Sequence, residues 1–142
     1  MIRAFLDTNV LIDWIVETDR PYREASLQIA QAILDHKLEG FVSTQSLVDT
    51  AYVASRAGCP FSCFEQLFRK MLQHINLTSL SSFDMLHALD HPSGDFEDDA
   101  QLSCADHEFC RYFVTGDSSL LRCKSFSDME ILSPPAFIQQ LQ

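Results

Sequence analysis

Two spacings of apolar residues alternate along the chain. Short runs rich in apolar residues occur at positions 2–6, 40–43, 75–80, 111–115 and, more weakly, 130–132. Each run has the length of a strand and is flanked by polar or turn-forming residues, which is typical of strands buried inside a sheet. The longer segments between the runs place apolar residues three or four positions apart, as one face of a helix does. The pattern therefore predicts strands that alternate with helices.

The segment that follows Pro60 has the strongest helical pattern. Its apolar stripe consists of Phe61, Phe64, Leu67, Phe68, Met71 and Leu72. We expect this stripe to pack against the sheet or a neighbouring helix, or to extend to a homodimer contact. Further helices are predicted over residues 10–15, 21–36, 45–56 and 95–107, in a short stretch after the capping sequence 81–84, and from residue 134 onward. A turn is predicted at residues 116–118.

This order of elements predicts the fold class. Strands separated by helices favour a three-layer α/β/α sandwich with a mostly parallel central sheet of about five strands. The length of 142 residues fits one domain spanning residues 1–142. In sheets of this kind, functional side chains gather beyond the carboxyl ends of the strands. Polar residues that directly follow a predicted strand are therefore the first candidates for a site.

Composition and charge narrow the possible functions. Hydrophobic residues make up 46% of the chain, and 20 acidic residues against 10 basic ones give a net charge of −10. So acidic a chain is not expected to coat nucleic acid non-specifically, because such binding depends on Lys and Arg contacts with phosphates. No apolar run approaches the roughly 20 residues of a membrane span, and Asp7 interrupts the run where a signal peptide would continue. With an odd count of five scattered cysteines, these features favour a cytoplasmic protein with free thiols.

Four acidic residues lie where this fold would place a site. Asp7 directly follows the first predicted strand, and Asp117 comes two residues after the strand at 111–115. Asp98 lies at the start of the helix before that strand, and Asp49 lies early in the helix after the second strand. If these carboxylates share one crevice, their repulsion requires raised pKa values or a cation. Oxygen ligands suit Mg²⁺ or Mn²⁺, and such ions support phosphodiester hydrolysis.

Each of these acids also has a structural alternative. Asp7, Asp95 and Asp117 are good N-cap residues, and an acid at position 98 favours the helix dipole. Asp49 fits the edge of a solvated helix face. Spacing alone does not choose between a helix cap and a metal ligand, so both interpretations stay open for each acid taken singly.

The histidines and the tryptophan carry weaker signals. His87 and His91 are four residues apart without any further ligand pattern, so stacking on one helix face is expected rather than zinc binding. Trp14 follows the Asp7 segment and could stack on a base, but packing or a dimer contact is the stronger expectation.

Several segments, taken together, resemble the PIN-domain nucleases. The segment from Phe5 to Asp13 resembles the family's opening motif, and the segment from Asp95 to Gln101 strongly resembles its third motif. Weaker resemblances, in the order expected for the VapC-like subgroup common in bacteria, cover residues 20–22, 43–49, 112–117 and 131–137. The resemblance extends over nearly the whole chain and implies a metal-dependent ribonuclease on a parallel α/β/α sheet.

Carried over position by position, the resemblance assigns the acids. It implies that Asp7, Asp98 and Asp117 bind Mg²⁺ or Mn²⁺ and, with Asp49, form the catalytic cluster. Asp49 falls where many relatives have Glu and this subgroup often has Asn, so its role as a ligand stays open. Asp99 departs from the usual Ala, and it is expected to support the ligands or to lie on the surface.

The resemblance also implies supporting residues and partners. Thr8, Asn9 and Thr115 are expected to orient the acids through hydrogen bonds, or simply to form turns. Arg122 and Lys124 lie close to Asp117 in sequence and are the best placed candidates for contacts with RNA. The implied partners are an RNA substrate, an antitoxin protein and a second copy of the chain.

Two alternatives remain at this stage. The domain could be a catalytically inactive PIN-like module that binds RNA or protein, and binding of Mn²⁺ together with cleavage would separate this alternative from a nuclease. A DNA flap nuclease is less expected, because 142 residues leave no room for an added helical clamp.

Overall fold

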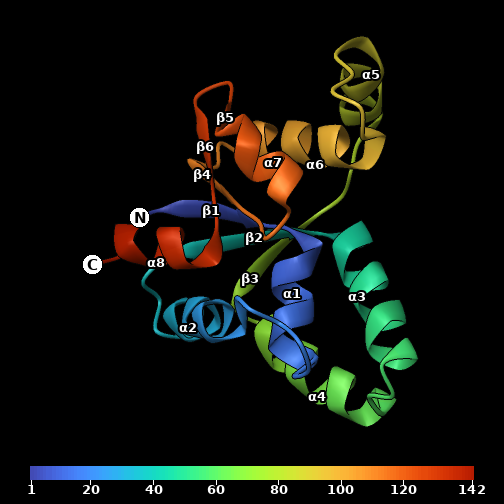
Figure 1. Cartoon of the computed structure of the whole chain (residues 1–142), viewed down its shortest axis with the longest axis vertical. Coiled ribbons are helices and arrows are strands. Elements are labelled where there is room, and N and C mark those ends of the chain that lie inside the picture. The colour runs from blue at the N-terminus through green and yellow to red at the C-terminus, as the bar shows by residue number, and fades with distance from the viewer.

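The computed structural model describes residues 1–142 and contains a central six-stranded sheet (Figure 1). The strands are β1 (Arg3–Leu6), β2 (Glu39–Ser43), β3 (Ile75–Thr78), β4 (Tyr112–Val114), β5 (Ser125–Phe126) and β6 (Met129–Leu132). Across the sheet they follow the order β3-β2-β1-β4-β6-β5, and all neighbours are parallel except β5 and β6. The expected mostly parallel sandwich is confirmed, and the short antiparallel β5 is a strand that the sequence pattern did not predict.

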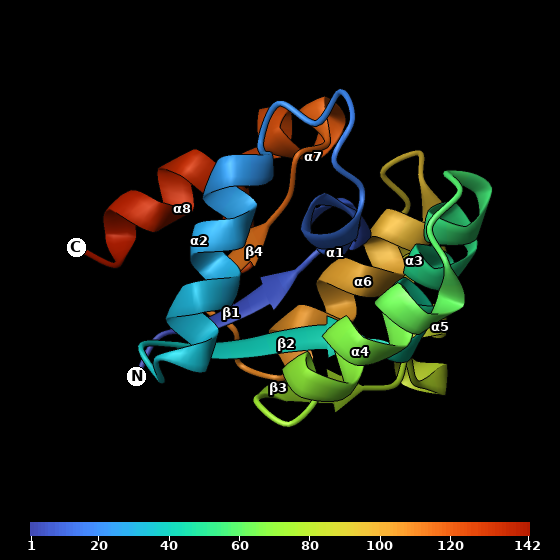
Figure 2. The same cartoon turned by 90° about the horizontal axis from the view of Figure 1, so that it is seen from below.

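Eight helices cover the two faces of this sheet. They are α1 (Thr8–Ile15), α2 (Arg23–Leu34), α3 (Thr44–Arg56), α4 (Phe61–Met71), α5 (Ser82–Asp90), α6 (Phe96–His107), α7 (Ser118–Cys123) and α8 (Pro134–Gln140). Figures 1 and 2 show α1, α2, α4 and α8 on one side of the sheet and α6 and α7 on the other. Where a turn is expected at residues 116–118, residues 116 and 117 form the connection after β4, and α7 already begins at Ser118.

Alternation along the short strands builds a core on each face of the sheet. In β1, Ala4 and Leu6 pack with α1, α2, α4 and α8, whereas Phe5 faces α6 and α7. Phe5 stacks on Phe113 of β4 with ring centroids 5.4 Å apart. Both rings are fully buried, and burying one such side chain contributes about 1.5–3 kcal/mol. The central strands are therefore held rigidly from both sides.

Side-chain caps fix the point where most helices begin. Asp7, Ser43, Ser81, Asp95, Asp117 and Ser133 each accept a hydrogen bond from a backbone N–H in the first turn of the helix they precede. Five of these caps lie at the carboxyl end of a parallel strand: Ser43 is the last residue of β2, Asp7 and Ser133 directly follow β1 and β6, and Ser81 and Asp117 come three residues after β3 and β4. Strand, cap and helix therefore repeat at the carboxyl edge of the sheet and concentrate polar side chains there.

The apolar stripe of α4 divides between the core and the surface. Phe68 and Met71 are buried, Phe64 packs partly against the core, and Phe61 is 71% exposed. Trp14 is buried, contacts Phe68 and donates its Nε1 hydrogen to the Ser26 carbonyl, which confirms its packing role. No helix of the chain has the length and apolar character needed to cross a membrane.

Candidate active site

Asp7, Asp98 and Asp117 come together although they are far apart in the sequence. Asp7 follows β1 and Asp117 follows the neighbouring parallel strand β4, so both lie at the same edge of the sheet. Asp98 lies in the first turn of α6, and its backbone N–H donates to the Asp95 carboxylate at 3.0 Å. Asp7, Asp95 and Asp117 are all close enough to Asp98 to act on its charge. The parallel pairing of β1 and β4 thus explains how these acids become neighbours.

The Asp7 carboxylate is buried and held by three donors. Its Oδ1 accepts the Thr8 N–H at 2.7 Å, and its Oδ2 accepts Thr115 Oγ1 at 2.8 Å and Asn9 Nδ2 at 3.2 Å. Burial raises the pKa of Asp7, the three hydrogen bonds lower it, and the nearby charge of Asp117 raises it further. Asp7 is therefore a rigid carboxylate in a position that disfavours its negative charge.

Asn9 and Thr115 join the two acidic turns. Asn9 Oδ1 accepts the Gly116 N–H at 2.8 Å, and Asn9 Nδ2 also donates to Thr115 Oγ1 at 3.2 Å. Thr115 Oγ1 in turn accepts the Asp117 N–H at 3.0 Å while it donates to Asp7. The orienting positions expected for Asn9 and Thr115 therefore coincide with real hydrogen bonds between the two turns.

The carboxyl group of Asp98 has a strongly raised pKa. It is half-buried, and burial together with the charges of Asp7, Asp95 and Asp117 raises its pKa to about 7. Asp95, Asp98 and Asp117 line a pocket of about 380 Å³ between the α5–α6 connection and α7. The carboxylates that face this pocket therefore repel one another at neutral pH.

Asp49 lies beside Glu97 and belongs to the margin of the cluster. The two side chains are within hydrogen-bonding reach, and burial and the charges of Asp49 and Asp7 raise the pKa of Glu97. Asp49 also accepts Gln45 Nε2 at 2.9 Å on the surface of α3. It does not line the pocket of Asp98 and Asp117. Sequence reasoning missed Glu97, because acids in a first helical turn are already explained by the helix dipole.

Thr8 takes part in a buried network beneath the acids. Its Oγ1 donates to Ser46 Oγ at 2.8 Å, and Gln101 Nε2 donates to the same oxygen at 2.9 Å. Ser46 thus joins α1, α3 and α6. The Thr8 hydroxyl contacts no acid, and only the Thr8 backbone N–H donates to Asp7. The Gln101 Oε1 atom is buried without a hydrogen-bond partner.

Asp99 holds the loop before α6 rather than a neighbouring carboxylate. It is buried, and its two oxygens accept the Ser93 N–H at 2.9 Å and the Ser93 hydroxyl at 2.6 Å. Ser93 in turn lines the pocket that Asp98 faces. Asp99 therefore shapes the wall of the pocket from behind.

Arg122 and Lys124 flank a residue of the same pocket but do not line the pocket themselves. Both are exposed, neither forms an ion pair, and Cys123 between them lines the pocket. Lys124 ends α7 with a φ of 66°, a left-handed conformation that non-glycine residues seldom adopt. The structure thus leaves two cations without an ion pair at the end of α7, on either side of a residue of the pocket.

The chemistry of the donor set fits a hard divalent cation. Both oxygens of Asp98 and the Oδ2 of Asp117 accept no hydrogen bond from the protein, and they adjoin the buried Asp7. No three acidic, histidine or cysteine side chains converge on one point in the conformations present. Uncompensated carboxylates of this kind match the oxygen ligands of Mg²⁺ and Mn²⁺. Asp7, Asp98 and Asp117 are the residues that could hold such an ion.

Fold and site together define a class: an α/β domain with a carboxylate cluster at the carboxyl edge of a parallel sheet. The sequence profile of the PIN domain matches residues 3–119, a span that contains Asp7, Asp49, Asp98 and Asp117. The chain therefore belongs to the PIN-domain family.

A solved structure has a similar fold. The crystal structure of VapC20 from Mycobacterium tuberculosis, described as a sarcin-ricin loop cleaving toxin, is similar with a TM-score of 0.68. The similarity covers 89% of this chain and 98% of that chain, at 10% sequence identity. Identity this low shows a shared fold alone. A search of curated proteins finds no match.

Proposed function

We propose that this chain is a metal-dependent endoribonuclease that hydrolyses phosphodiester bonds in RNA. The observation that carries the proposal is the position of Asp98, whose pKa is raised to about 7 by burial and by Asp7, Asp95 and Asp117. A cation bound by these groups would relieve the repulsion that their ionisation creates. Membership of the PIN-domain family supports a nuclease, and the fold shared with a toxin that cleaves an RNA loop supports RNA as the substrate.

Each residue of the site has a distinct part in this proposal. Asp7, Asp98 and Asp117 hold Mg²⁺ or Mn²⁺, which when bound supplies an acidified water and neutralises charge on the phosphate. Asn9 and Thr115 fix the orientation of Asp7, whose Oδ2 they contact. Asp49 and Glu97 add negative charge at the margin. Arg122 and Lys124 bind phosphates of the RNA chain and offset the charge of the acids.

Cleavage of a labelled pool of single-stranded RNA tests the proposal. We expect cleavage with Mg²⁺ or Mn²⁺ that EDTA abolishes and that Asp98→Asn reduces about a hundredfold or more, because a lost ligand forfeits charge stabilisation worth several kcal/mol. Asp106→Asn removes an exposed acid near the other end of α6 and is the matched control. It should cleave like the unaltered chain.

The inactive alternative makes a different prediction in the same experiment. A PIN-like module that only binds RNA or protein would show no cleavage with either ion, and calorimetry would detect no binding of Mn²⁺. Binding of Mn²⁺ without cleavage of the pool would retain the metal site and direct the search to structured RNA.

The proposal extends to a toxin held in check by an antitoxin. The toxin with which this chain shares its fold motivates the extension. Expression of the chain alone should arrest growth, and Asp98→Asn should relieve the arrest. Co-expression of the product of a small neighbouring open reading frame should also relieve it, and failure of every neighbouring frame to do so would contradict the antitoxin.

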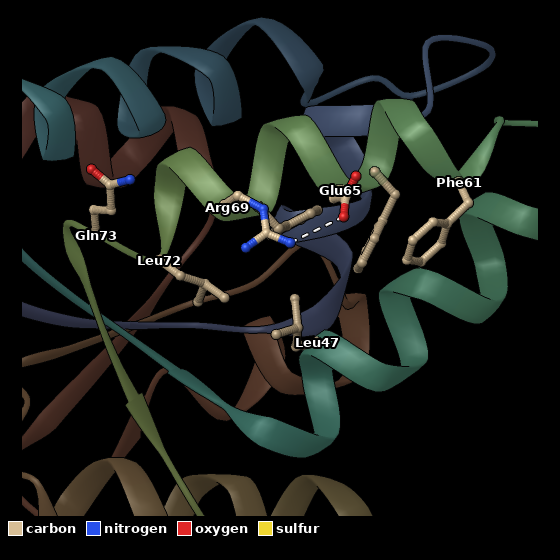
Figure 3. Close-up of a pocket in the computed structure, with 8 residues that line it drawn as sticks. Leu47, Phe61, Glu65, Arg69, Leu72 and Gln73 are labelled. Atoms are coloured by element: carbon tan, nitrogen blue, oxygen red, sulfur yellow. Dashed lines mark hydrogen bonds and ion pairs between the residues drawn. The ribbon is translucent and has the colours of Figure 1, made fainter.

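An apolar groove is the candidate surface for a homodimer. Figure 3 shows a pocket lined by Phe61 of α4, by Leu72 directly after α4 and by Leu47 of α3, with the Arg69–Glu65 ion pair beside them. The volume of this pocket is about 490 Å³. The exposed Tyr52 lies on the adjacent helix α3. If two copies pair here, Phe61→Ser should lower the molar mass found by light scattering to that of a monomer. Phe109→Ser, at an even more exposed aromatic residue before β4, should not.

A further inference from the structure

Four aromatic rings form a continuous stack on α5 and the end of α6. In order they are His91, His87, Phe83 and His107, and we call them the ring ladder. Successive ring centroids are 4.4, 6.0 and 4.4 Å apart, and the interplanar angles are 24°, 27° and 34°. The rings of this series stack on one another, and their histidines belong to no group of three side chains that could hold a metal ion. The series is therefore built for stacking rather than for binding a metal ion.

The ring ladder is exposed rather than part of the core. His91 is exposed, Phe83 is 55% exposed, and the His107 side chain is 48% exposed. His91, at one end, stacks on no ring other than His87. Figure 1 shows α5 projecting from the body of the molecule, so this helix is open to solvent.

The base of the ladder is fixed by buried polar contacts. Asp84, which is buried between α5 and α6, accepts the Ser103 hydroxyl at 2.9 Å and lies 3.2 Å from His107 Nδ1. The ring of Phe126 stands edge-on to His87 at 6.0 Å. The rings are thus held in place before any ligand arrives, which lowers the entropy cost of binding a planar group.

Two chain segments connect the ladder to the candidate active site. The first runs from His91 through Ser93 and Gly94, which line the pocket, to Asp98. The second runs from Asp117 through Cys123, which also lines the pocket, to Phe126, which contacts His87. The ladder and the acids are therefore joined by two short chain segments, both of which carry residues that line the pocket.

Two cations without an ion pair belong to the second of these segments. Arg122 and Lys124 lie between Asp117 and Phe126 in the sequence, and both are exposed. Stacked rings, two cations on the adjoining segment and a cluster of carboxylates match bases, phosphates and a scissile bond in turn. A protein partner would not require planar faces, and a duplex would keep its bases inside its own stack.

We propose that the ring ladder is a stacking platform for the bases of single-stranded RNA next to the active site. This inference rests on the proposed function, because it assigns the substrate of that same site a single-stranded segment beside the cleaved bond. A base of the strand stacks on His91 and continues the series of rings, and the adjoining phosphates meet Arg122 and Lys124.

Binding of a fluorescein-labelled single-stranded RNA, followed by anisotropy in an Asp98→Asn background with Mg²⁺, tests the platform. We expect His87→Ala with His91→Ala to weaken binding about tenfold, the loss of roughly one base stack. The matched control is His36→Ala with His74→Ala, a second pair of contacting histidines 5.5 Å apart that adjoins the amino ends of β2 and β3. The control should bind RNA as the parent does.

An RNA of equal length that carries abasic sites separates stacking from phosphate contacts. The ladder variant and the parent should bind this RNA equally, because the stacking partner is gone. His91→Trp should tighten binding of the base-containing RNA several-fold, since Trp offers a larger ring, and a folding defect cannot produce that gain. Three results would each overturn the platform. The first is that the ladder and control variants bind normal RNA equally well, and the second is that the ladder variant loses as much affinity for abasic RNA as for normal RNA. The third is that the chain prefers a duplex to a single strand.

Cleavage by the chain with Asp98 intact tests the proposed function independently of the platform. Binding that depends on the ladder, without cleavage under any metal condition, would retain the platform and reject the nuclease. Metal-dependent cleavage with no effect of the ladder variants would retain the nuclease and reject the platform.

Discussion

At the residue scale, Asp7 shows that a helix cap and a candidate metal ligand can be the same carboxylate. Oδ1 of Asp7 caps α1 through the Thr8 N–H, while Oδ2 is turned toward Thr115 and Asn9. Asp117 divides its oxygens in the same way, since only Oδ1 accepts the Ser119 N–H. The two interpretations that the sequence left open for these acids are therefore compatible.

The raised pKa of Asp98 predicts a stability that depends on pH in the metal-free protein. Its folded pKa of about 7 lies above its ordinary value of 3.8, so the folded state binds the proton more tightly than the unfolded state. The resulting stability is complete below about pH 4 and is lost as the pH rises through 7. In EDTA, the melting temperature should fall between pH 5 and pH 8, and Asp98→Asn should reduce this fall.

Asp106→Asn is the control for this pH profile, because Asp106 is exposed on the same helix. It should melt with the same pH dependence as the unaltered chain. A profile that Asp98→Asn leaves unchanged would contradict the crowding of carboxylates around Asp98.

Thr115→Val tests whether the hydrogen bonds around Asp7 serve catalysis. The replacement keeps the shape but removes the hydroxyl that donates to Asp7 and accepts the Asp117 N–H. We expect about 1–3 kcal/mol lower stability and a fall of about tenfold or more in the cleavage rate, because Asp7 loses a fixed orientation.

Thr78→Val provides the comparison, since the Thr78 hydroxyl donates to Glu108 at 2.9 Å, away from the acids. It should lower stability without slowing cleavage beyond the fraction unfolded. Equal effects of the two variants on the rate would mean that Thr115 is a structural residue only.

The acids that sequence could predict are those that follow strands. Asp7 and Asp117 were predictable because a strand-end position in a parallel sheet is itself a signal, and Asp98 because its motif resembles a family pattern. Glu97 and Asp99 flank Asp98 and differ only in the face of α6 that they occupy. That face depends on how α6 packs, so spacing alone could not show that Glu97 meets Asp49 whereas Asp99 binds Ser93.

At the scale of elements, a buried ion pair joins α1, α2 and the loop between them. Asp13 of α1 accepts Arg20 Nε at 2.7 Å and also the hydroxyl of Ser26 in α2. Arg20 Nη2 donates to the Asn9 carbonyl at 2.9 Å, so the pair also supports the turn that carries Asn9. The loop is thereby attached to the site.

Asp13→Ala should therefore lower the stability of the fold more than most single changes outside the acidic cluster of the site. The Asp13 side chain is 5% exposed, and the change removes the hydrogen bonds that it accepts from Arg20 and Ser26, each worth about 1.5–3 kcal/mol because the acceptor is charged. Urea unfolding should show a lower midpoint with an unchanged slope. Glu65→Ala breaks the exposed Arg69–Glu65 pair of α4 and should cost less than about 1 kcal/mol. Similar losses for both variants would contradict the buried role of Asp13.

The elements that the sequence pattern did not predict are the shortest ones. Strand β5 has two residues and α7 has six. These are too few residues to show the apolar spacing of a strand or of a helix. Both form because neighbouring elements hold them: Leu120 of α7 is buried in the core beneath Phe5 and Phe113, and β5 pairs with β6. Packing rather than local pattern decides these segments, and they carry Arg122, Lys124 and Phe126.

At the scale of the whole molecule, the long elements and their order along the chain were predictable, because helices and strands differ in the spacing of their apolar residues. The strand order was not, since alternation shows which strands are buried but not which ones pair. The order β3-β2-β1-β4-β6-β5 places the strands before Asp7 and Asp117 next to each other, and this neighbourhood creates the acidic cluster.

Because the net charge is −10, binding of RNA depends on where the 10 Lys and Arg side chains lie. Arg122 and Lys124 flank Cys123, which lines the pocket of Asp98 and Asp117, whereas Lys37 and Arg111 lie just before the amino ends of β2 and β4. If two phosphates of a single strand contact Arg122 and Lys124, each contributes about 0.7 to the slope of log affinity against log salt.

Arg122→Gln with Lys124→Gln should therefore weaken RNA binding and lower that slope by about 1.4. Lys37→Gln with Arg111→Gln changes the net charge by the same amount at the opposite edge of the sheet and should leave the slope nearly unchanged. Anisotropy titrations at several salt concentrations, again in the Asp98→Asn background, measure both. Equal slopes for the two double variants would mean that RNA senses only the total charge of the molecule. A loss confined to the first variant would place the phosphate path on α7, between the acids and the ring ladder.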